Sequence, residues 1–369
     1  MEKNRLLFMD SLRGIAAFLV VLYHYTSTYR SLYGHNFPKQ FDFAYGNYGV
    51  ELFFMISGFV IFFSFKRVKD GKDFLFKRVS RLYPAYWFCA IVTFASVQLI
   101  GLPGLETTFT DFLVNLTMFQ KLAGVPEVDG VYWTLFYEWM FYLMLLVIFV
   151  TRKLDKILYI GAVWMVLNFV NVHVYEIPYA SKLLNLYYGV FFYSGILFYL
   201  LKYKPEARRH VQVQLALATA VALSLYMHKG LADVCIIAGI YLVFYLSISG
   251  KLDFMSNKVF LFLGSISYPL YLFHQYIGYI IITNLKPYFG NSVLLVVPPI
   301  IFSIVCAYLI AVYVEQPMAQ LLKNWYKKLS DSKPATEKEP VPTSGFARPK
   351  QEEPEKFRIG SIAPSTEMS

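Results

Sequence analysis

The chain has 369 residues, of which 57% are hydrophobic and 16% are charged, and its formal net charge at pH 7 is +10. Soluble domains are about 45–50% apolar and about 25% charged, so this composition excludes an ordinary soluble protein. Continuous apolar stretches long enough to cross a bilayer recur along the chain, which predicts an all-α polytopic membrane protein. The strands of a membrane barrel would instead alternate apolar and polar residues.

Ten apolar segments are expected to be transmembrane helices. They are 7–27, 47–65, 82–101, 131–150, 156–172, 183–201, 211–228, 232–249, 263–284 and 292–314. The segment 108–120 is too short and too polar to span, and we expect it in the membrane interface. Residues 1–329 are predicted to be one transmembrane domain without the repeats typical of inverted-repeat transporters. Residues 330–369 are rich in Pro, Glu, Lys, Ser and Thr, which predicts a disordered cytoplasmic tail.

The orientation is predicted from the Lys and Arg residues in alternate loops. With the N-terminus inside, the cytoplasmic connections carry 21 of these residues and the opposite connections carry 6. Cytoplasmic loops of membrane proteins are enriched in Lys and Arg, so both termini are predicted to be cytoplasmic. The positive charge is therefore assigned to these loops, and no nucleic-acid partner is expected.

Cysteine usage and the N-terminus give little sign of processing or metal binding. Cys89, Cys235 and Cys306 each lie in an apolar segment without metal-ligand spacing, so neither a disulfide framework nor a metal site is expected. Asp10 and Arg13 interrupt the first apolar segment and no small-residue cleavage site follows it. We therefore expect a retained helix and not a signal peptide.

The first predicted span contains two residues that are unusual in lipid. In "SLRGIAAFLVVLYHY", ten residues separate Arg13 from His24. Eleven helical steps place both side chains on one face, about 16 Å apart along the axis. Arg13 would lie towards the cytoplasm and His24 towards the outer leaflet. An alternative interpretation is a snorkelling arginine and an interfacial histidine.

Other spans also carry polar residues at membrane depth, where charges are costly and usually functional. They are Glu51 and Ser57 in the second span, Glu138 in the fourth, Tyr268, Tyr271 and His274 in the ninth, and Glu315 at the end of the tenth. Each alone can be a hydrogen-bonded structural residue. Because His24, Glu51 and Glu138 all fall in the predicted outer half, they together indicate proton transfer by an imidazole near carboxylates.

A cytoplasmic loop supplies a candidate phosphate site. In "FKRVKDGKDFLFKRVSRLYP", Arg78 and Arg81 are three residues apart and share one helical face. Planar guanidinium groups suit phosphate recognition. Attraction to anionic lipid, or a purely topological role, is the alternative.

Six motifs occur in a specific order between about residues 5 and 320. They are "SLRGIAAFLVVLYHY", "GVELFFMISGFVI", "FLFKRVSRLYPAYW", "WTLFYEWMFY", "ISYPLYLFH" and "VEQP". This set resembles the membrane acyltransferase-3 family, bacterial enzymes that O-acylate carbohydrates. The resemblance implies a ten-helix bundle in the bacterial inner membrane that moves an acyl group from cytoplasmic acyl-CoA, usually acetyl-CoA, to a carbohydrate hydroxyl at the outer face. No permanently bound cofactor is expected, and membrane lipids are the remaining partners.

The same resemblance assigns roles to individual residues. It implies that His24 is catalytic, as general base or transient acyl carrier, that Glu138 is needed for activity, and that Arg13, Arg78 and Arg81 serve the donor. The chain lacks the extracytoplasmic hydrolase-like domain of larger members, so transfer would be completed within the bundle.

These roles combine with the spacing of Arg13 and His24 into a model of the site. Arg78 and Arg81 would hold the phosphates of coenzyme A, Arg13 would lie at the mouth of a tunnel, and the thioester would reach His24. Glu138 would orient the His24 ring or stabilise its cation. Glu51, Ser57, Tyr268 and His274 are weaker candidates, expected to line or support the tunnel. The competing hypotheses are a transporter or flippase for a lipid-linked sugar and a structural membrane protein.

Overall fold

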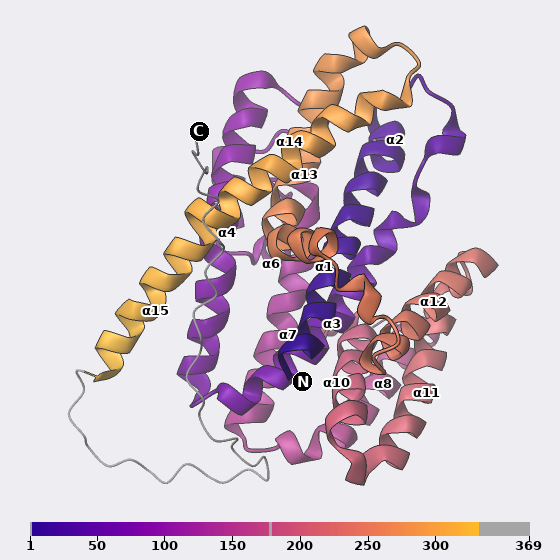
Figure 1. Cartoon of the computed structure of the whole chain (residues 1–369), viewed down its shortest axis with the longest axis vertical. Helices are drawn as coiled ribbons and strands as arrows, with labels where there is room; N and C mark the ends of the chain where they lie inside the picture. The colour runs from indigo at the N-terminus through magenta and orange to yellow at the C-terminus, as the bar shows by residue number, and fades with distance from the viewer. Residues whose placement is uncertain (1, 177–178, 332–369) are drawn as a thin grey trace, which may run out of the picture. The chain divides into compact units, whose positions relative to one another are not determined.

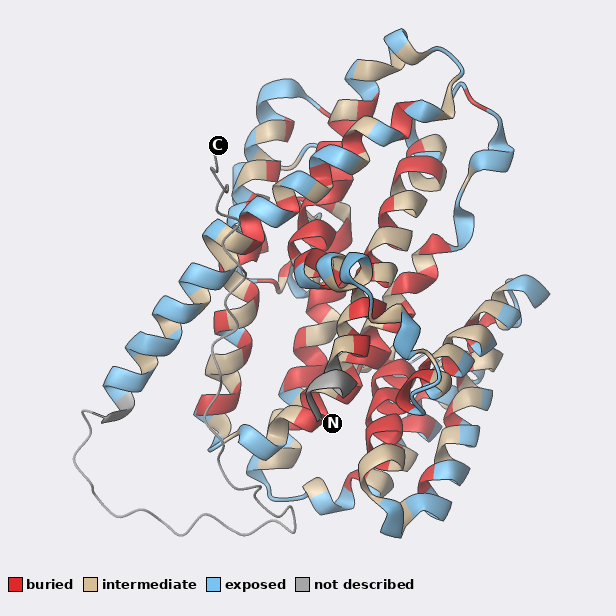
Figure 2. Ribbon diagram, in the orientation of Figure 1, coloured by how far each residue is buried: buried red, intermediate tan, exposed pale blue. Residues whose placement is uncertain are grey.

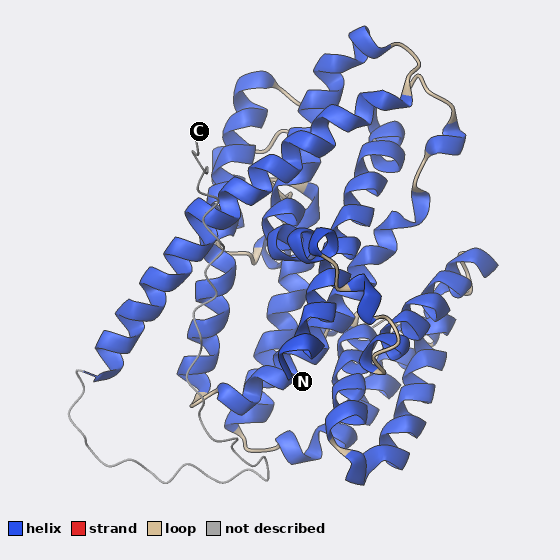
Figure 3. Cartoon of the chain, in the orientation of Figure 1, coloured by secondary structure: helices blue, strands red, loops and turns tan. Residues whose placement is uncertain are grey.

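The computed structural model describes residues 2–176 and 179–331, and all regular structure within them is helical (Figure 3). This confirms the all-α prediction. The helices are α1 (Glu2–Tyr23), α2 (Tyr29–Tyr33), α3 (Gly49–Ser64), α4 (Gly71–Ile100), α5 (Phe109–Asn115), α6 (Gln120–Ala123), α7 (Trp133–Val150), α8 (Ile157–His173), α9 (Ala180–Leu183), α10 (Gly189–Tyr203), α11 (Arg208–Tyr226), α12 (Leu231–Ile248), α13 (Lys258–Phe289), α14 (Val297–Ile310) and α15 (Gln316–Asp331).

Every predicted span coincides with a helix, but not every helix is apolar enough to be identified as a span by composition. Among the described residues, seven helical segments have the length and hydropathy needed to cross a membrane. The predicted spans that fall outside this set are those of α10, α11 and α13. The protein is therefore a membrane protein, whereas ten crossings and cytoplasmic termini stay predictions.

Some helices extend beyond their predicted bounds. α4 begins at Gly71, well before residue 82, because the Asp70 side chain caps it by accepting a hydrogen bond from Asp73 N at 2.8 Å. After α14, a π-helical turn over Ala311–Glu315 leads directly into α15. The expected interfacial segment 108–120 contains the short helices α5 and α6. The predicted tail 330–369 lies outside the described residues, apart from the end of α15.

Several of the connections lie at one of two opposite ends of the helices (Figure 1). At one end, Lys286 Nζ donates hydrogen bonds to the carbonyl oxygens of Tyr33 and Gly34 at 3.2 and 3.0 Å. At the other end, the Phe65 ring lies 5.1 Å from the rings of both Phe74 and Phe149. Alternate loops thus meet at the same end, as the charge count requires, although which end faces the cytoplasm stays a prediction.

The buried side chains lie on the inward faces of the central helices (Figure 2). α1 packs most extensively against α13. Gly14 and Gly264 allow this contact, since a Cβ on Gly14 would lie 2.5 Å from Gly264 N, and a Cβ on Gly264 would meet Asp10 O. Small residues permit such close helix crossings in membrane proteins. Ten residues further along each helix, His24 meets His274, so the two helices run parallel and in register.

Candidate active site

The His24 ring points into the bundle and contacts one residue of α13. Its Nδ1 lies 2.9 Å from His274 Nε2, and the two ring centroids are 5.0 Å apart. His24 is the first residue of the π-helical turn His24–Thr28 that follows α1, and π-helical turns are frequent at functional sites. His274 is fully buried.

The surroundings of His274 determine where the protons of this pair lie. His274 Nδ1 is 3.0 Å from Leu270 O and 2.9 Å from Tyr271 O. Carbonyl oxygens only accept hydrogen bonds, so Nδ1 of His274 must carry the proton. Nε2 of neutral His274 is then an acceptor, and His24 Nδ1 must donate to it. A neutral His24 consequently keeps its lone pair on Nε2, the atom that a general base or an acyl carrier uses.

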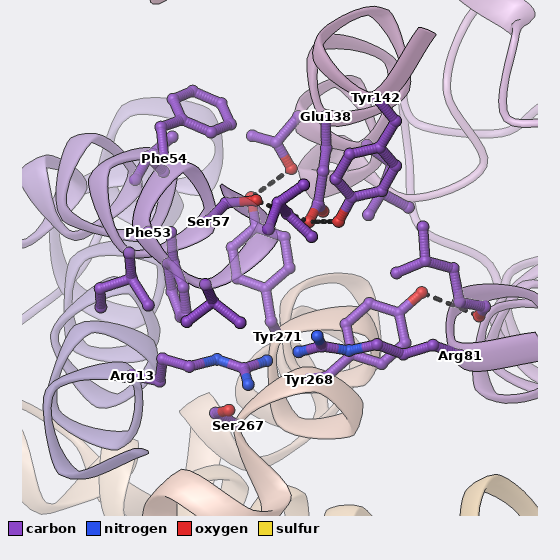
Figure 4. A pocket seen from close by; sticks show the side chains of 17 residues that line it. Arg13, Phe53, Phe54, Ser57, Arg81, Glu138, Tyr142, Ser267, Tyr268 and Tyr271 are labelled. Carbon is purple, nitrogen blue, oxygen red and sulfur yellow. Dashed lines mark hydrogen bonds between the residues drawn. The ribbon is translucent and has the colours of Figure 1, made fainter. Parts of the chain in front are cut away.

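A cavity lies between α1, α3, α4, α7 and α13, and neither His24 nor His274 is among its lining residues. Its empty volume is about 730 Å³, including open space at the mouth. The polar residues that line it are Arg13, Ser57, Arg81, Thr134, Glu138, Tyr142, Ser267, Tyr268 and Tyr271; the rest of the lining is apolar (Figure 4). The structure therefore brings together most of the polar residues predicted for the site.

Two positive charges converge on the cavity. Figure 4 shows the guanidinium groups of Arg13 and Arg81 pointing toward each other. Among the described residues, neither takes part in an ion pair, although Asp10, Glu138 and Glu315 exert a favourable electrostatic influence on one or both of them. Two like charges facing one space are typical of a site for an anion such as phosphate.

Glu138 is held by residues other than His24. Its Oε1 accepts hydrogen bonds from Tyr142 OH, one helical turn further along α7, and from Ser57 Oγ at 3.2 Å. Glu138 was expected to orient the His24 ring or stabilise its cation, but the contact of His24 Nδ1 is made by His274. The reason is the rotation of α7, which directs Glu138 to Ser57 of α3 and not to α1.

Arg78 differs from the other two arginines, because it is buried and does not line the cavity. Its guanidinium lies over the rings of Phe74 and Tyr142, at 5.3 and 5.7 Å, and donates to Ser64 Oγ at 3.1 Å. Arg78 therefore lies behind Tyr142, which in turn contacts Glu138.

Tyr271 connects the cavity with the histidine pair. Its side chain lines the cavity and forms a hydrogen bond with Thr134 Oγ1 at 2.9 Å, while its backbone carbonyl contacts His274 Nδ1. Tyr268, one turn earlier on α13, also lines the cavity and donates to Leu82 O at 2.9 Å. The cavity and the histidines are thus adjacent parts of one region.

Glu51 lies away from the cavity. It is buried, and its Oε1 accepts a hydrogen bond from Tyr226 OH of α11 at 2.6 Å. Glu51, which was expected to line or support the tunnel, is not among the residues that line the cavity. On α3, the residues that face the cavity include Val50, Phe53 and Ser57 instead.

Two interactions of the candidate site, those of Tyr142 with Glu138 and of His274 with His24, were not predicted from the sequence. Tyr142 was missed, although its spacing of four residues from Glu138 on one helix was a usable signal. The direct contact of His274 with His24 had no sequence signal, since 250 residues separate them.

Comparisons with known proteins identify the family. The family model described as "Acyltransferase domain" matches residues 6–312. A protein of Acidianus two-tailed virus, named as an acetyltransferase, is 28% identical over 290 residues, which cover 74% of this chain and 84% of the viral protein. No solved structure matches. The chain therefore belongs to the acyltransferase-3 family and is a membrane acyltransferase.

Proposed function

We propose that this protein is an acyl-CoA-dependent carbohydrate O-acyltransferase of the bacterial inner membrane, with acetyl as the acyl group. The observation that carries the proposal is the His24–His274 pair beside a cavity into which Arg13 and Arg81 point. The family supports acyl transfer, and the viral relative's name favours acetyl. The acceptor class follows from the family resemblance.

The donor would bind through its phosphates to Arg13 and Arg81. Both guanidinium groups face the cavity without an ion-pair partner among the described residues, so they are available to bind an anion. The separation of Arg13 and His24 along α1, about 16 Å, suits a donor whose phosphates and thioester are joined by a long arm. Arg78 would act behind Tyr142 by fixing the Tyr142–Glu138 hydrogen bond.

His24 Nε2 would take the proton of the acceptor hydroxyl. The oxygen then attacks the thioester carbonyl carbon, the C–S bond breaks, and the departing thiolate receives the proton from His24. In the covalent alternative, His24 Nε2 attacks the thioester carbon, the C–S bond breaks and coenzyme A leaves as the thiolate. The acceptor oxygen then attacks the acyl carbon, the bond to Nε2 breaks, and the hydroxyl proton passes to the thiolate. His274 stabilises the ring in both routes by accepting the hydrogen bond of Nδ1–H.

Purified protein in nanodiscs with labelled acetyl-CoA tests the proposal. Wild-type protein should transfer or hydrolyse the acetyl group, and His24→Ala should lower the rate by about 10²- to 10⁴-fold, the usual contribution of a general base. Residual activity within tenfold of wild type would remove His24 from the mechanism. Acetyl label trapped on His24 would support the covalent route, whereas strictly sequential kinetics would rule it out.

The acceptor can be identified separately. Mass spectrometry of surface glycans from a strain lacking the gene should show the loss of one acetyl ester relative to the parent strain. Unchanged glycan esters, together with retained acetyl-CoA turnover by the purified protein, would overturn the carbohydrate acceptor but not acyl transfer.

A further inference from the structure

A second cavity lies between α10, α11 and α12 and shares no lining residue with the candidate active site. Its empty volume is about 640 Å³, including open space. It is lined by Leu201, Lys202, Arg208, Gln212, Tyr245, Ile248 and Ser249. Two of these side chains are cations, and none is an acid.

The cavity lies at the end of the bundle that carries most of the positive charge. α10 runs parallel to α3, since Phe54 stacks on Phe192 near one end and Phe63 lies 5.9 Å from Tyr203 at the other. Lys66, in the connection after α3, lies 5.0 Å from the ring of Tyr203. The second cavity therefore opens at the same end as the Lys- and Arg-rich α3–α4 connection, which is the predicted cytoplasmic end.

The electrostatic surroundings favour an anion. Arg208 is the first residue of α11, whose first turn contains no acid and whose N-cap, Ala207, provides no side-chain cap. The positive end of the α11 dipole therefore adds to the two cations of the lining. The acid closest in sequence to Arg208, Glu206, is paired with Lys204 at 3.5 Å.

One wall of the cavity is apolar. Leu201, Ile248 and the ring of Tyr245 form it, and Tyr245 is 46% exposed on the outside of the bundle. Gln212 and Ser249 add neutral hydrogen-bonding groups. Cationic and polar donors beside an apolar wall, at the boundary between lipid and cytoplasm, match a phosphate group attached to a hydrophobic body.

We propose that this cavity is a phosphate-binding site, separate from the active site, that takes the headgroup of an anionic phospholipid or a free phosphate. Arg208 provides the main contact through its guanidinium fork, and Lys202 contributes a second positive charge. Lys202 is held in place by donating to Ile248 O, at the last turn of α12. The site does not depend on the proposed acyl transfer.

The test compares two variants that remove one positive charge from neighbouring residues. Both residues are exposed, but Arg208→Gln changes a residue that lines the cavity, whereas Arg209→Gln changes one that does not. Native mass spectrometry of the detergent-purified protein, titrated with phosphatidylglycerol or phosphatidylcholine, gives the affinity of each. Arg208→Gln should weaken phosphatidylglycerol binding about tenfold, as expected for loss of one charge-assisted contact, and Arg208→Lys should restore part of it.

The outcomes identify the source of the phosphate or overturn the site. Phosphatidylglycerol binding that depends on Arg208 and resists inorganic phosphate assigns the site to lipid. Displacement by inorganic phosphate, again dependent on Arg208, assigns it to a soluble phosphate. Equal weakening by Arg208→Gln and Arg209→Gln would overturn the proposal, because the effect would then be general surface charge. Thermal unfolding of each variant checks that the fold is kept.

Discussion

At the residue scale, the orientation of His24 depends on His274, whose own proton is fixed by the backbone of α13. A glutamine at position 274 has an amide that can reach the place of Nε2 and accept from His24 Nδ1, whereas an alanine cannot. We therefore expect His274→Gln to keep substantially more activity than His274→Ala, with the KM for acetyl-CoA unchanged in both. Steady-state kinetics of the two variants checks this. Equal loss in both would indicate that His274 only fills space.

Substitutions of the three arginines are expected to change different kinetic constants. Arg13 and Arg81 face the cavity, whereas Arg78 is packed against Tyr142. Loss of a charge-assisted contact to phosphate should raise the KM for acetyl-CoA about tenfold in Arg81→Gln. Arg78→Gln should instead lower kcat, because Tyr142 loses its support.

Comparing acetyl-CoA with acetyl-pantetheine, which lacks the nucleotide phosphates, isolates the phosphate contact. With acetyl-pantetheine as the donor, wild type and Arg81→Gln should have the same KM. A difference that persists would assign Arg81 to the fold and not to the donor.

At the element scale, the contact of α1 with α13 sets the geometry of the histidine pair. A Cβ at position 264 would meet the backbone of Asp10, so Gly264→Ala must move the two helices apart or shift their register. His24 and His274 lie ten residues further along the same crossing, about 15 Å away. We expect Gly264→Ala to reduce kcat by tenfold or more, on the order of the cost of displacing a positioned group by about 1 Å.

Gly239→Ala is the matched control for this change. Gly239 lies on α12, and nothing lies within 4 Å of the Cβ that an alanine would add there. This variant should keep both activity and thermal stability in detergent. A Gly264→Ala protein with wild-type kcat would show that the α1–α13 spacing does not control the histidine pair.

Sequence patterns predict which residues are helical and how deep each side chain lies, but not which helices are neighbours. The depths of His24 and Glu138 follow from counting residues along α1 and α7. Their partners do not, because the direction of each side chain depends on how the helices are rotated against one another. Glu138 therefore contacts Tyr142 and Ser57, while His274, predicted to line or support the tunnel, contacts His24. The roles of these residues in catalysis stay predictions.

At the scale of the whole molecule, the number of membrane crossings depends on α10, α11 and α13, which are too short or too polar to be identified as spans by length and hydropathy. α13 contains the buried His274 and Gln275, and on α11 Gln214 accepts a hydrogen bond from Tyr193 of α10. His274 and Gln214 have protein partners, and the amide nitrogen of Gln275 donates to Tyr279 OH, so these polar groups lower the hydropathy of a helix while turning towards the protein and not towards lipid. α10 is short, with 15 residues. The same physics explains why the length and hydropathy of whole helices identify seven spans, whereas the apolar segments of the sequence predict ten.

Cysteine labelling in intact cells distinguishes seven membrane crossings from ten. In a protein with Cys89, Cys235 and Cys306 replaced by serine, Asn36→Cys should react with a membrane-impermeant maleimide and Lys69→Cys should not, if the N-terminus is cytoplasmic.

The decisive position for the number of crossings is Glu206, between α10 and α11. If both helices cross, Glu206→Cys is protected until the membrane is permeabilised; if neither crosses, it lies on the same side as Asn36→Cys and reacts at once. Ser292→Cys, after α13, tests the ninth crossing in the same way, because it reaches the outer side only if α13 spans. Labelling of Asn36→Cys and Ser292→Cys with protection of Lys69→Cys and Glu206→Cys is the pattern that places His24 in the outer half, opposite the cytoplasmic source of acyl-CoA. Labelling of Lys69→Cys with protection of Asn36→Cys would instead require the donor to reach His24 from the other side.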